Sequence, residues 1–194
     1  MAQKHPDYFN APVPPFGARR PKLLIVGLAP GAHGANATGR PFTGDHAGIL
    51  LYRTLYQFGL STRPQSSGAE DGLRLKGCRI TNAVKCLPPA NKPCADEIRR
   101  CNDYLKAELA DLGPRLVILA LGRVAHDAVL LAHGVRRSSY AFGHGRAHRI
   151  GTGRWLVDSY HCSRYNTQTG RLTEDMFRSA FGKAARLAAG GAVP

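Results

Sequence analysis

The stretch KLLIVGLAP at residues 22–30 decides the fold, because it is a short, continuous apolar run that ends in glycine and proline. Such a run is typical of a strand that is buried on both faces, as the strands of a parallel sheet are. Three further strands are predicted at 77–86, 115–122 and 154–161. The chain therefore contains four candidates for the strands of one buried sheet.

Helical patterns alternate with these strands. Apolar residues recur at helical spacing in 46–59, 95–113, 122–134 and 172–190, and Thr173 is a suitable N-cap for the last of these helices. Alternation of strands and helices predicts an α/β fold with a four-stranded parallel sheet and right-handed crossovers.

The length of 194 residues suits one domain with one core. We expect a single domain over 22–190. Residues 1–21 are rich in proline and aromatic residues and follow neither periodicity, so they are predicted to be an N-terminal extended arm that wraps the domain. The N-terminus lacks the apolar core of a signal peptide, and no apolar run approaches the roughly 18 residues of a membrane span, so a cytosolic protein with no membrane partner is expected.

The charge balance points to a polyanion as partner. Lysine and arginine total 27 against 13 aspartate and glutamate residues, which gives a net charge of +14 and a pI near 10.1. A surface this basic repels itself and is typical of nucleic-acid binding, although a generic basic protein is the alternative.

Three polar segments leave the carboxyl ends of the predicted strands, at 29–46, 82–93 and 161–171. In parallel sheets the chemistry collects at these ends, so we expect the site where the three segments converge. The first segment belongs to a loop with five glycines and two prolines at 27–45, which matches neither GxGxxG nor a Walker loop. A loop that wraps a planar base would need an aromatic ring and a carboxylate, which Phe42 and Asp45 supply; a purely structural turn is the alternative.

Two further polar residues stand at strand ends. The Asn82 amide matches the O4 and N3–H edge of uracil, or else pairs with neighbouring backbone. His161 is placed to donate to a carbonyl oxygen on which charge develops, or else is structural. In RYNTQTGR (164–171), Arg164 and Arg171 suit phosphates and Tyr165 could wedge into a base stack, unless this is a solvated loop that caps the last helix.

The chain has five cysteines, at positions 78, 86, 94, 101 and 162. A disulfide framework is not expected in the cytosol. Cys86 and Cys101 are half of the four-cysteine set that an iron–sulfur cluster needs, while Cys94 between them matches no CxxC spacing. On spacing alone the metal-binding signal is weak, and core thiols are the alternative.

Together, LLIVGLAPGAHGANATGRPFTGD, TNAVKCLPPANKP with Cys101 after it, and HCSRYNTQTGRLT resemble the family 5 (UDGb-type) uracil-DNA glycosylases. The resemblance covers nearly the whole chain. It implies a three-layer α/β/α sandwich around a central four-stranded parallel sheet and the excision of uracil from DNA in base-excision repair. It also implies a broad range, with hypoxanthine and other deaminated bases accepted.

The resemblance also implies a role for each site residue. Phe42 would stack on the flipped base, Asn82 would read its edge, Asp45 would position the attacking water, and His161 would stabilise the leaving base. Relatives in the wider superfamily carry an acid or amide at the position of Ala29, so the use of Asp45 resembles family 5. The remaining predicted contacts are with substrate for Gly27, Ala29, Pro30 and Gly31, and with DNA for Arg164, Tyr165, Asn166 and Arg171.

The family usually holds a [4Fe–4S] cluster on four cysteines, two of which match Cys86 and Cys101. The other two come from an N-terminal CxxC that would end near Met1, so either the sequence is truncated or this member has lost the cluster. We expect the two sulfurs to approach each other without a complete cluster in this chain. The expected partner is uracil-containing DNA, double-stranded and also single-stranded, bound by a monomer in the bacterial or archaeal cytosol.

Three other classes stay open: a non-catalytic nucleic-acid-binding homologue, a small-molecule nucleoside hydrolase, and an inactive homologue. The first leaves the residues Phe42, Asp45, Asn82 and His161 without a role. The second uses the same site chemistry but has no need of a charge of +14.

Overall fold

The computed structural model describes residues 1–151 and 153–192. In chain order its elements are β1 (Phe16–Gly17), β2 (Leu23–Gly27), α1 (Ala35–Thr38), α2 (His46–Gln57), β3 (Cys78–Asn82), η1 (Pro89–Asn91), α3 (Ala95–Ala110), β4 (Val117–Leu121), α4 (Arg123–Ala132), η2 (Arg137–Ser139), β5 (Ala147–Ile150), β6 (Arg154–Ser159), α5 (Arg164–Gln168) and α6 (Glu174–Ala188).

The strands form one sheet in the order β1-β3-β2-β4-β6-β5. The four central strands are parallel, and the register places Gly27 at the end of β2 opposite Asn82 at the end of β3. The prediction of four parallel strands is confirmed, but the prediction that the sheet holds four strands is wrong. β1 and β5 add antiparallel edges to it. Both are short and only partly buried, so neither produces an apolar pattern that the sequence could display.

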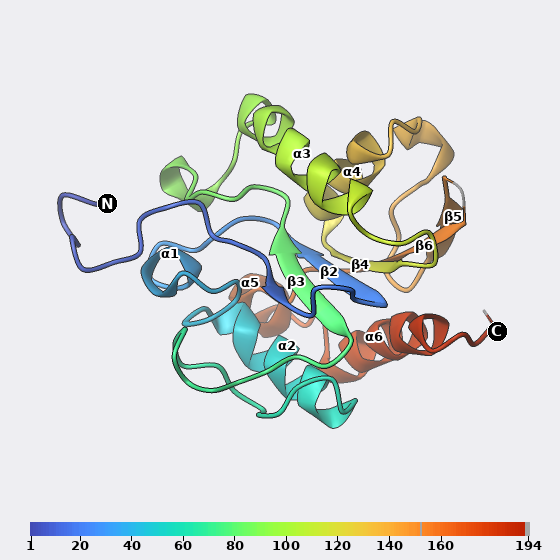
Figure 1. Ribbon diagram of the computed structural model, residues 1–194, viewed down its shortest axis with the longest axis horizontal. Coiled ribbons are helices and arrows are strands. Elements are labelled where there is room, and N and C mark those ends of the chain that lie inside the picture. Colours follow the sequence, from blue (N-terminus) through green and yellow to red (C-terminus); the bar gives the residue numbers. More distant parts are fainter. Residues whose placement is uncertain (152, 193–194) are drawn as a thin grey trace.

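The sheet lies between two layers of helices, with α3 and α4 on one face and α2 and α6 on the other (Figure 1). Successive side chains of β2 point to opposite faces. Leu23 and Ile25 join the core beneath α2 and α6, and Leu24 and Val26 join the core beneath α3 and α4. Burial on both faces is the physical reason for the continuous apolar runs.

Residues 1–21 run along the surface of this sandwich and contribute only β1 to its layers. The Val13 N–H donates to Lys85 O at 2.8 Å, and Phe16 pairs with Ile80 in β3. The two termini lie at opposite ends of the molecule (Figure 1). Among the described residues, no helix combines the length and the apolar character that crossing a bilayer requires.

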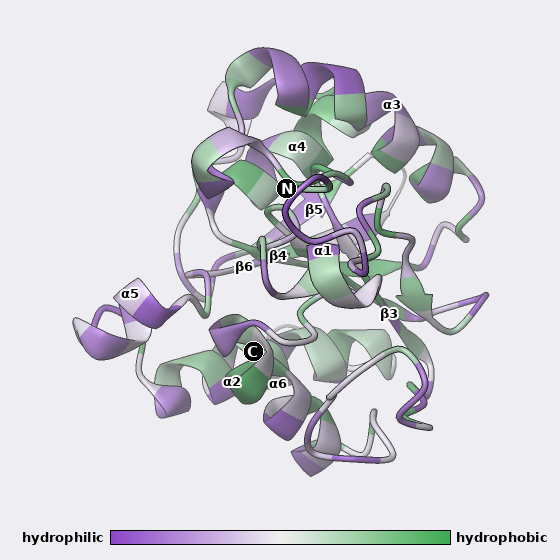
Figure 2. Cartoon of the chain, turned by 90° about the vertical axis from the view of Figure 1, so that its left-hand side faces the viewer, coloured by the Kyte–Doolittle hydropathy of each residue, from purple (hydrophilic) through white to green (hydrophobic). Residues whose placement is uncertain are grey.

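One segment that the sequence predicts as a loop is helical. The first residues of RYNTQTGR form α5, and the Ser163 side chain caps it by accepting from Asn166 N–H at 3.4 Å. Figure 2 shows α5 as a largely hydrophilic element that stands apart from the helices packed on the sheet. A helix of five residues is too short to show helical periodicity in the sequence.

Candidate active site

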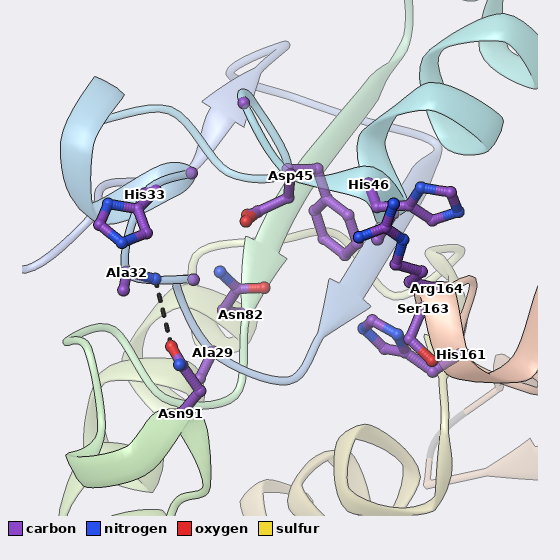
Figure 3. A pocket seen from close by; sticks show the side chains of 15 residues that line it. Ala29, Ala32, His33, Asp45, His46, Asn82, Asn91, His161, Ser163 and Arg164 are labelled. Atoms are coloured by element: carbon purple, nitrogen blue, oxygen red, sulfur yellow. Dashed lines mark hydrogen bonds between the residues drawn. The ribbon is translucent and has the colours of Figure 1, made fainter.

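A cavity of about 430 Å³ lies at the carboxyl ends of the parallel strands. It is lined by Ala29, Gly31, Ala32, His33, Gly34, Phe42, Gly44, Asp45, His46, Ala47, Asn82, Asn91, His161, Ser163 and Arg164. These residues come from the three polar segments that leave β2, β3 and β6. Figure 3 shows Asp45 and Asn82 on one side of this cavity and His161, Ser163 and Arg164 on the other.

Asp45 precedes α2, but its carboxylate does not cap that helix. It turns instead toward the glycine-rich loop, where Ala35 N–H donates to Oδ2 at 3.3 Å. Burial raises the pKa of Asp45 above its ordinary value, and the backbone N–H groups of Ala35 and Gly31 oppose that rise. The result is a carboxylate that is fixed by backbone and partly removed from water.

Three glycines are required by close packing around the polar groups. A Cβ at Gly31 or Gly34 would overlap Oδ1 of Asp45, and a Cβ at Gly27 would overlap Oδ1 of Asn82. The glycine-rich loop therefore makes room for the side chains of the site. Gly27 and Pro30 are both buried, and neither is among the residues that line the cavity.

Phe42 forms a flat wall of the cavity. Its φ of 60° is a left-handed conformation that is rare for a bulky residue and is concentrated at functional sites. The ring stacks with that of His161, with centroids 6.0 Å apart and planes at 23°. A planar ligand could lie against these aromatic surfaces.

His161 follows β6 and faces the same cavity as Asp45. Burial lowers the pKa of His161 to about 4. Its side chain makes no hydrogen bond with any described residue. The imidazole is therefore neutral near pH 7 and can donate one N–H to a ligand.

Asn82 is buried at the end of β3, with 4% of its surface exposed. Within the described part of the chain, its side-chain amide makes no hydrogen bond. A buried amide without a protein partner is costly unless water or a ligand satisfies it. Its carbonyl and NH₂ are thus available to a molecule in the cavity.

Four polar side chains on the wall of this cavity were not predicted from the sequence. Asn91 Oδ1 accepts from Ala32 N–H at 3.2 Å, which ties the segment after β3 to the glycine-rich loop (Figure 3). His33, His46 and Ser163 complete this set. Asn91 and Ser163 are polar residues in segments that leave strand ends. That position in the sequence could have identified them as candidate site residues.

The residues predicted to contact DNA occupy two places. Arg164 lines the main cavity, whereas Asn166 and Arg171 line a neighbouring cavity of about 240 Å³ that also contacts His161. The Asn166 amide donates to His161 O at 2.8 Å, and the Arg171 guanidinium lies 4.9 Å from the Tyr160 ring centroid. Tyr165 is 70% exposed on α5.

The cysteines fall into two groups. Cys78 and Cys162 lie in the core, and burial raises the pKa of both thiols to about 12, as expected for unreactive core residues. Cys86 is exposed and Cys101 partly buried. Burial, and to a smaller extent the charge of Cys101, raises the pKa of Cys86.

Comparison with known proteins gives a consistent result. A family model described as the uracil DNA glycosylase superfamily matches residues 14–185. The chain is 49% identical over 181 residues to the type-5 uracil-DNA glycosylase of Thermus thermophilus, which covers 93% of this chain and 82% of that protein. It is 42% identical over 179 residues to the type-5 uracil-DNA glycosylase of Pyrobaculum aerophilum, covering 92% of this chain and 77% of that protein. A type-4 uracil-DNA glycosylase of Archaeoglobus fulgidus is 38% identical over 114 residues, or 58% of this chain and 49% of that protein.

Proposed function

This chain belongs to the uracil-DNA glycosylase superfamily and, within it, to the type-5 group, and from this premise we propose that it excises uracil from DNA. The reaction is hydrolysis of the N-glycosidic bond, which releases the base and leaves an abasic site in base-excision repair. The observation that carries the proposal is that Asp45 and His161, from loops far apart in the sequence, line one cavity together with Phe42 and Asn82.

The substrate nucleotide must leave the duplex to enter the cavity. Flipping costs a few kcal/mol, and less for a mismatched base such as uracil opposite guanine. In the proposed complex Phe42 stacks on the flipped uracil. The Asn82 NH₂ donates to O4 and its carbonyl accepts from N3–H. Ala29 and Gly31 on the cavity wall, with Gly27 and Pro30 behind it, shape the slot.

Bond breaking produces a cationic, oxocarbenium-like sugar and a uracil anion. The C1′–N1 bond breaks, and its electron pair leaves with the base. A water molecule held by the Asp45 carboxylate attacks C1′, and Asp45 accepts the proton that this water loses. Because the carboxylate is fixed by backbone N–H groups, it is already oriented when charge develops on the sugar.

His161 acts on the leaving group. Its pKa of about 4 keeps the imidazole neutral, so it donates an N–H to the uracil anion without transferring a full charge into the cavity. A preorganised donor of this kind stabilises charge that appears only in the transition state.

Positive charge brings the protein to its substrate. With a net charge of +14, association with DNA is steered electrostatically and is strongly salt-dependent. Arg164 and Arg171 contact phosphates beside the flipped nucleotide, and Asn166 also contacts the DNA. The exposed Tyr165 inserts into the base stack. The proposal extends to hypoxanthine and other deaminated bases, to single-stranded as well as double-stranded DNA, and to a monomer in the bacterial or archaeal cytosol.

A [4Fe–4S] cluster fits this chain in part. Cys86 and Cys101, which are exposed and partly buried respectively, would supply two of the four thiolates that such a cluster needs. Cys78 and Cys162 lie in the core beneath α2 and α6, away from that pair. When bound, the cluster would add structural cross-links between α3 and the segment after β3. No step of the proposed reaction involves it.

The test is incubation of the protein with a labelled duplex that carries one uracil opposite guanine. We expect an alkali-labile abasic site at that position and none in the matching thymine duplex. Free deoxyuridine should remain intact; its cleavage in preference to DNA would favour the nucleoside hydrolase. Binding to the duplex without cleavage would favour the non-catalytic or inactive homologue. Replacement of Asp45 by asparagine should abolish most cleavage while leaving DNA binding intact.

A further inference from the structure

The N-terminal segment 5–10 is docked on the loop that holds the catalytic carboxylate. Phe9 N–H donates to Ala37 O and Asn10 N–H donates to Asn36 O, each at 3.1 Å. The segment therefore follows the backbone of α1, which lies within the glycine-rich loop.

A side-chain bridge reinforces this docking. The Asn36 amide, with 4% of the residue exposed, donates to Asn10 Oδ1 at 3.0 Å. The Asn10 amide in turn donates to His5 O at 2.7 Å and to Tyr8 O at 3.1 Å. Asn10 adopts a φ of 49°, a left-handed conformation that asparagine tolerates better than most residues. One asparagine thus folds segment 5–10 and joins it to the loop.

A second contact reaches the cavity itself. The Tyr8 hydroxyl lies 3.0 Å from Nδ1 of His33, a residue of the cavity wall. The His5 ring stacks on Tyr8 with centroids 4.5 Å apart. Segment 5–10 therefore holds the glycine-rich loop at two points, Asn36 and His33.

The loop that carries these two contacts also holds Asp45. Asn36 N–H donates to Gly31 O at 3.1 Å, which closes the loop on itself. The Ala35 N–H donates to the Asp45 carboxylate at 3.3 Å. The path from Asn10 to Asp45 therefore consists of the Asn36–Asn10 hydrogen bond, the peptide link between Asn36 and Ala35, and the Ala35–Asp45 hydrogen bond.

We propose that segment 5–10 is a positioning element of the active site, in which Asn10 and Tyr8 hold the loop 31–36 so that Asp45 aims its water at the sugar. This inference rests on the proposed function, because it assigns a role within that reaction. Misplacement of a reacting group by about 1 Å is enough to lower a rate by about 100-fold, so a loop anchor can act without touching the substrate.

The experiment is a double-mutant cycle that joins Asn10→Ala with Asp45→Asn. Excision from a uracil duplex is measured under single-turnover conditions, with DNA affinity and thermal stability measured beside it. In the parent background Asn10→Ala should slow excision about tenfold, with DNA affinity unchanged within about twofold. In the Asp45→Asn background the same change should have no further effect beyond about twofold, because the group that Asn10 positions is already inactive.

Tyr8→Phe provides a milder variant in case Asn10→Ala does not fold. It keeps the stacked ring and removes the hydroxyl near His33, so excision should slow about threefold, as for loss of one hydrogen bond. The matched control is Tyr56→Phe on α2, a half-exposed tyrosine whose hydroxyl makes no hydrogen bond to the described residues. This control should excise uracil at the parent rate.

Rate losses of equal size in both backgrounds would overturn the inference, because Asn10 would then act independently of Asp45. Folded Asn10→Ala and Tyr8→Phe variants with the parent rate would also overturn it. Failure of the parent protein itself to release uracil would reject the proposed function instead. The two failures are therefore distinguishable.

Discussion

The chain holds two arrangements of an aspartate and a histidine, and they are built in opposite ways. Asp158 and His126 are both fully buried and in direct contact, with Oδ1 2.7 Å from Nδ1. Asp45 and His161 face one cavity, and each is left without the other as a partner. The comparison separates a closed pair, whose polar groups all have protein partners that include His148 and Gly143, from an open pair, whose polar groups remain available to a ligand.

The charge states of the two histidines follow from this difference. Burial by itself disfavours the imidazolium of His126, but the hydrogen bond and the charge of Asp158 outweigh it and raise the pKa of His126. The second nitrogen of His126 lies 2.8 Å from Tyr140 O, so both nitrogens have acceptors. His161 has only the burial effect, and its pKa is lowered. Partners rather than burial decide which histidine is charged.

The largest expected effect comes from a substitution in the open pair, Asp45 and His161. Asp45→Asn keeps the size of the side chain but removes the charge and the proton acceptor, so single-turnover excision should fall by about 10²–10⁴-fold. The rate of the parent should also decline as the pH falls through the pKa of Asp45, which burial places above the ordinary value of 3.8. The measurement is release of uracil from a labelled duplex with enzyme in excess.

Asp103→Asn is the matched control for this prediction. Asp103 is exposed on α3 and makes no ion pair with the described residues. The Asp103→Asn variant should excise uracil at the parent rate. An Asp45→Asn variant that matches this control would remove Asp45 from the chemistry.

The next largest effect comes from a substitution in the closed pair, Asp158 and His126. Asp158→Asn removes the charge beside His126 and disturbs Oδ2, which accepts from Gly143 N–H at 3.2 Å. Because both partners are buried, we expect a loss of unfolding free energy on the order of 3 kcal/mol. Urea unfolding measures the loss, and excision by the folded variant should stay within about threefold of the parent. A rate as low as that of Asp45→Asn at unchanged stability would reverse the two assignments.

The strands that could be predicted from the sequence are the ones buried on both faces of the sheet. β2, β3, β4 and β6 are buried on both faces, and KLLIVGLAP shows that burial directly as a continuous apolar run. β1 and β5 lie at the sheet edges and are only partly buried. Without burial on both faces they need no continuous apolar run, so the sequence carries little sign of these two strands.

The site likewise contains residues that could be predicted from the sequence and contacts that could not. Phe42, Asp45, Asn82 and His161 could be brought together from the sequence because parallel strands end at one edge of the sheet. Asn91 contacts Ala32 across 59 positions, and that contact depends on a turn conformation that residue types do not specify. The pairing of His126 on α4 with Asp158 on β6, 32 positions apart, depends on how that helix packs against the sheet, which the residue types do not specify either.

A smaller effect on the rate tests the histidine of the open pair. His161→Ala removes a single donor to the leaving base, so excision should slow by about 10²-fold. His133→Ala is the control, because His133 lies at the end of α4 with Nδ1 2.8 Å from Val129 O and outside the cavity. The same single-turnover assay compares them. Equal rates for both variants would leave His161 without a role on the leaving group.

The smallest effect is the opposite pH dependence of the two histidines. The pKa of His161 is about 4 in the folded state against an ordinary 6.5, so its contribution to stability is fully present above pH 6.5 and is lost as the pH falls toward 4. The pKa of His126 is raised above 6.5, so its contribution is fully present below pH 6.5 and is lost as the pH rises through the folded value. Thermal unfolding of His161→Gln and His126→Gln between pH 4.5 and 9 measures both, and each should change Tm relative to the parent by about 2–4 °C across its window. The Tm of the parent minus that of His161→Gln should rise with pH, and the corresponding difference for His126→Gln should fall with pH. Slopes of the same sign would contradict the opposite pKa shifts of these two histidines. The comparison between the closed and the open pair would then lose its physical basis.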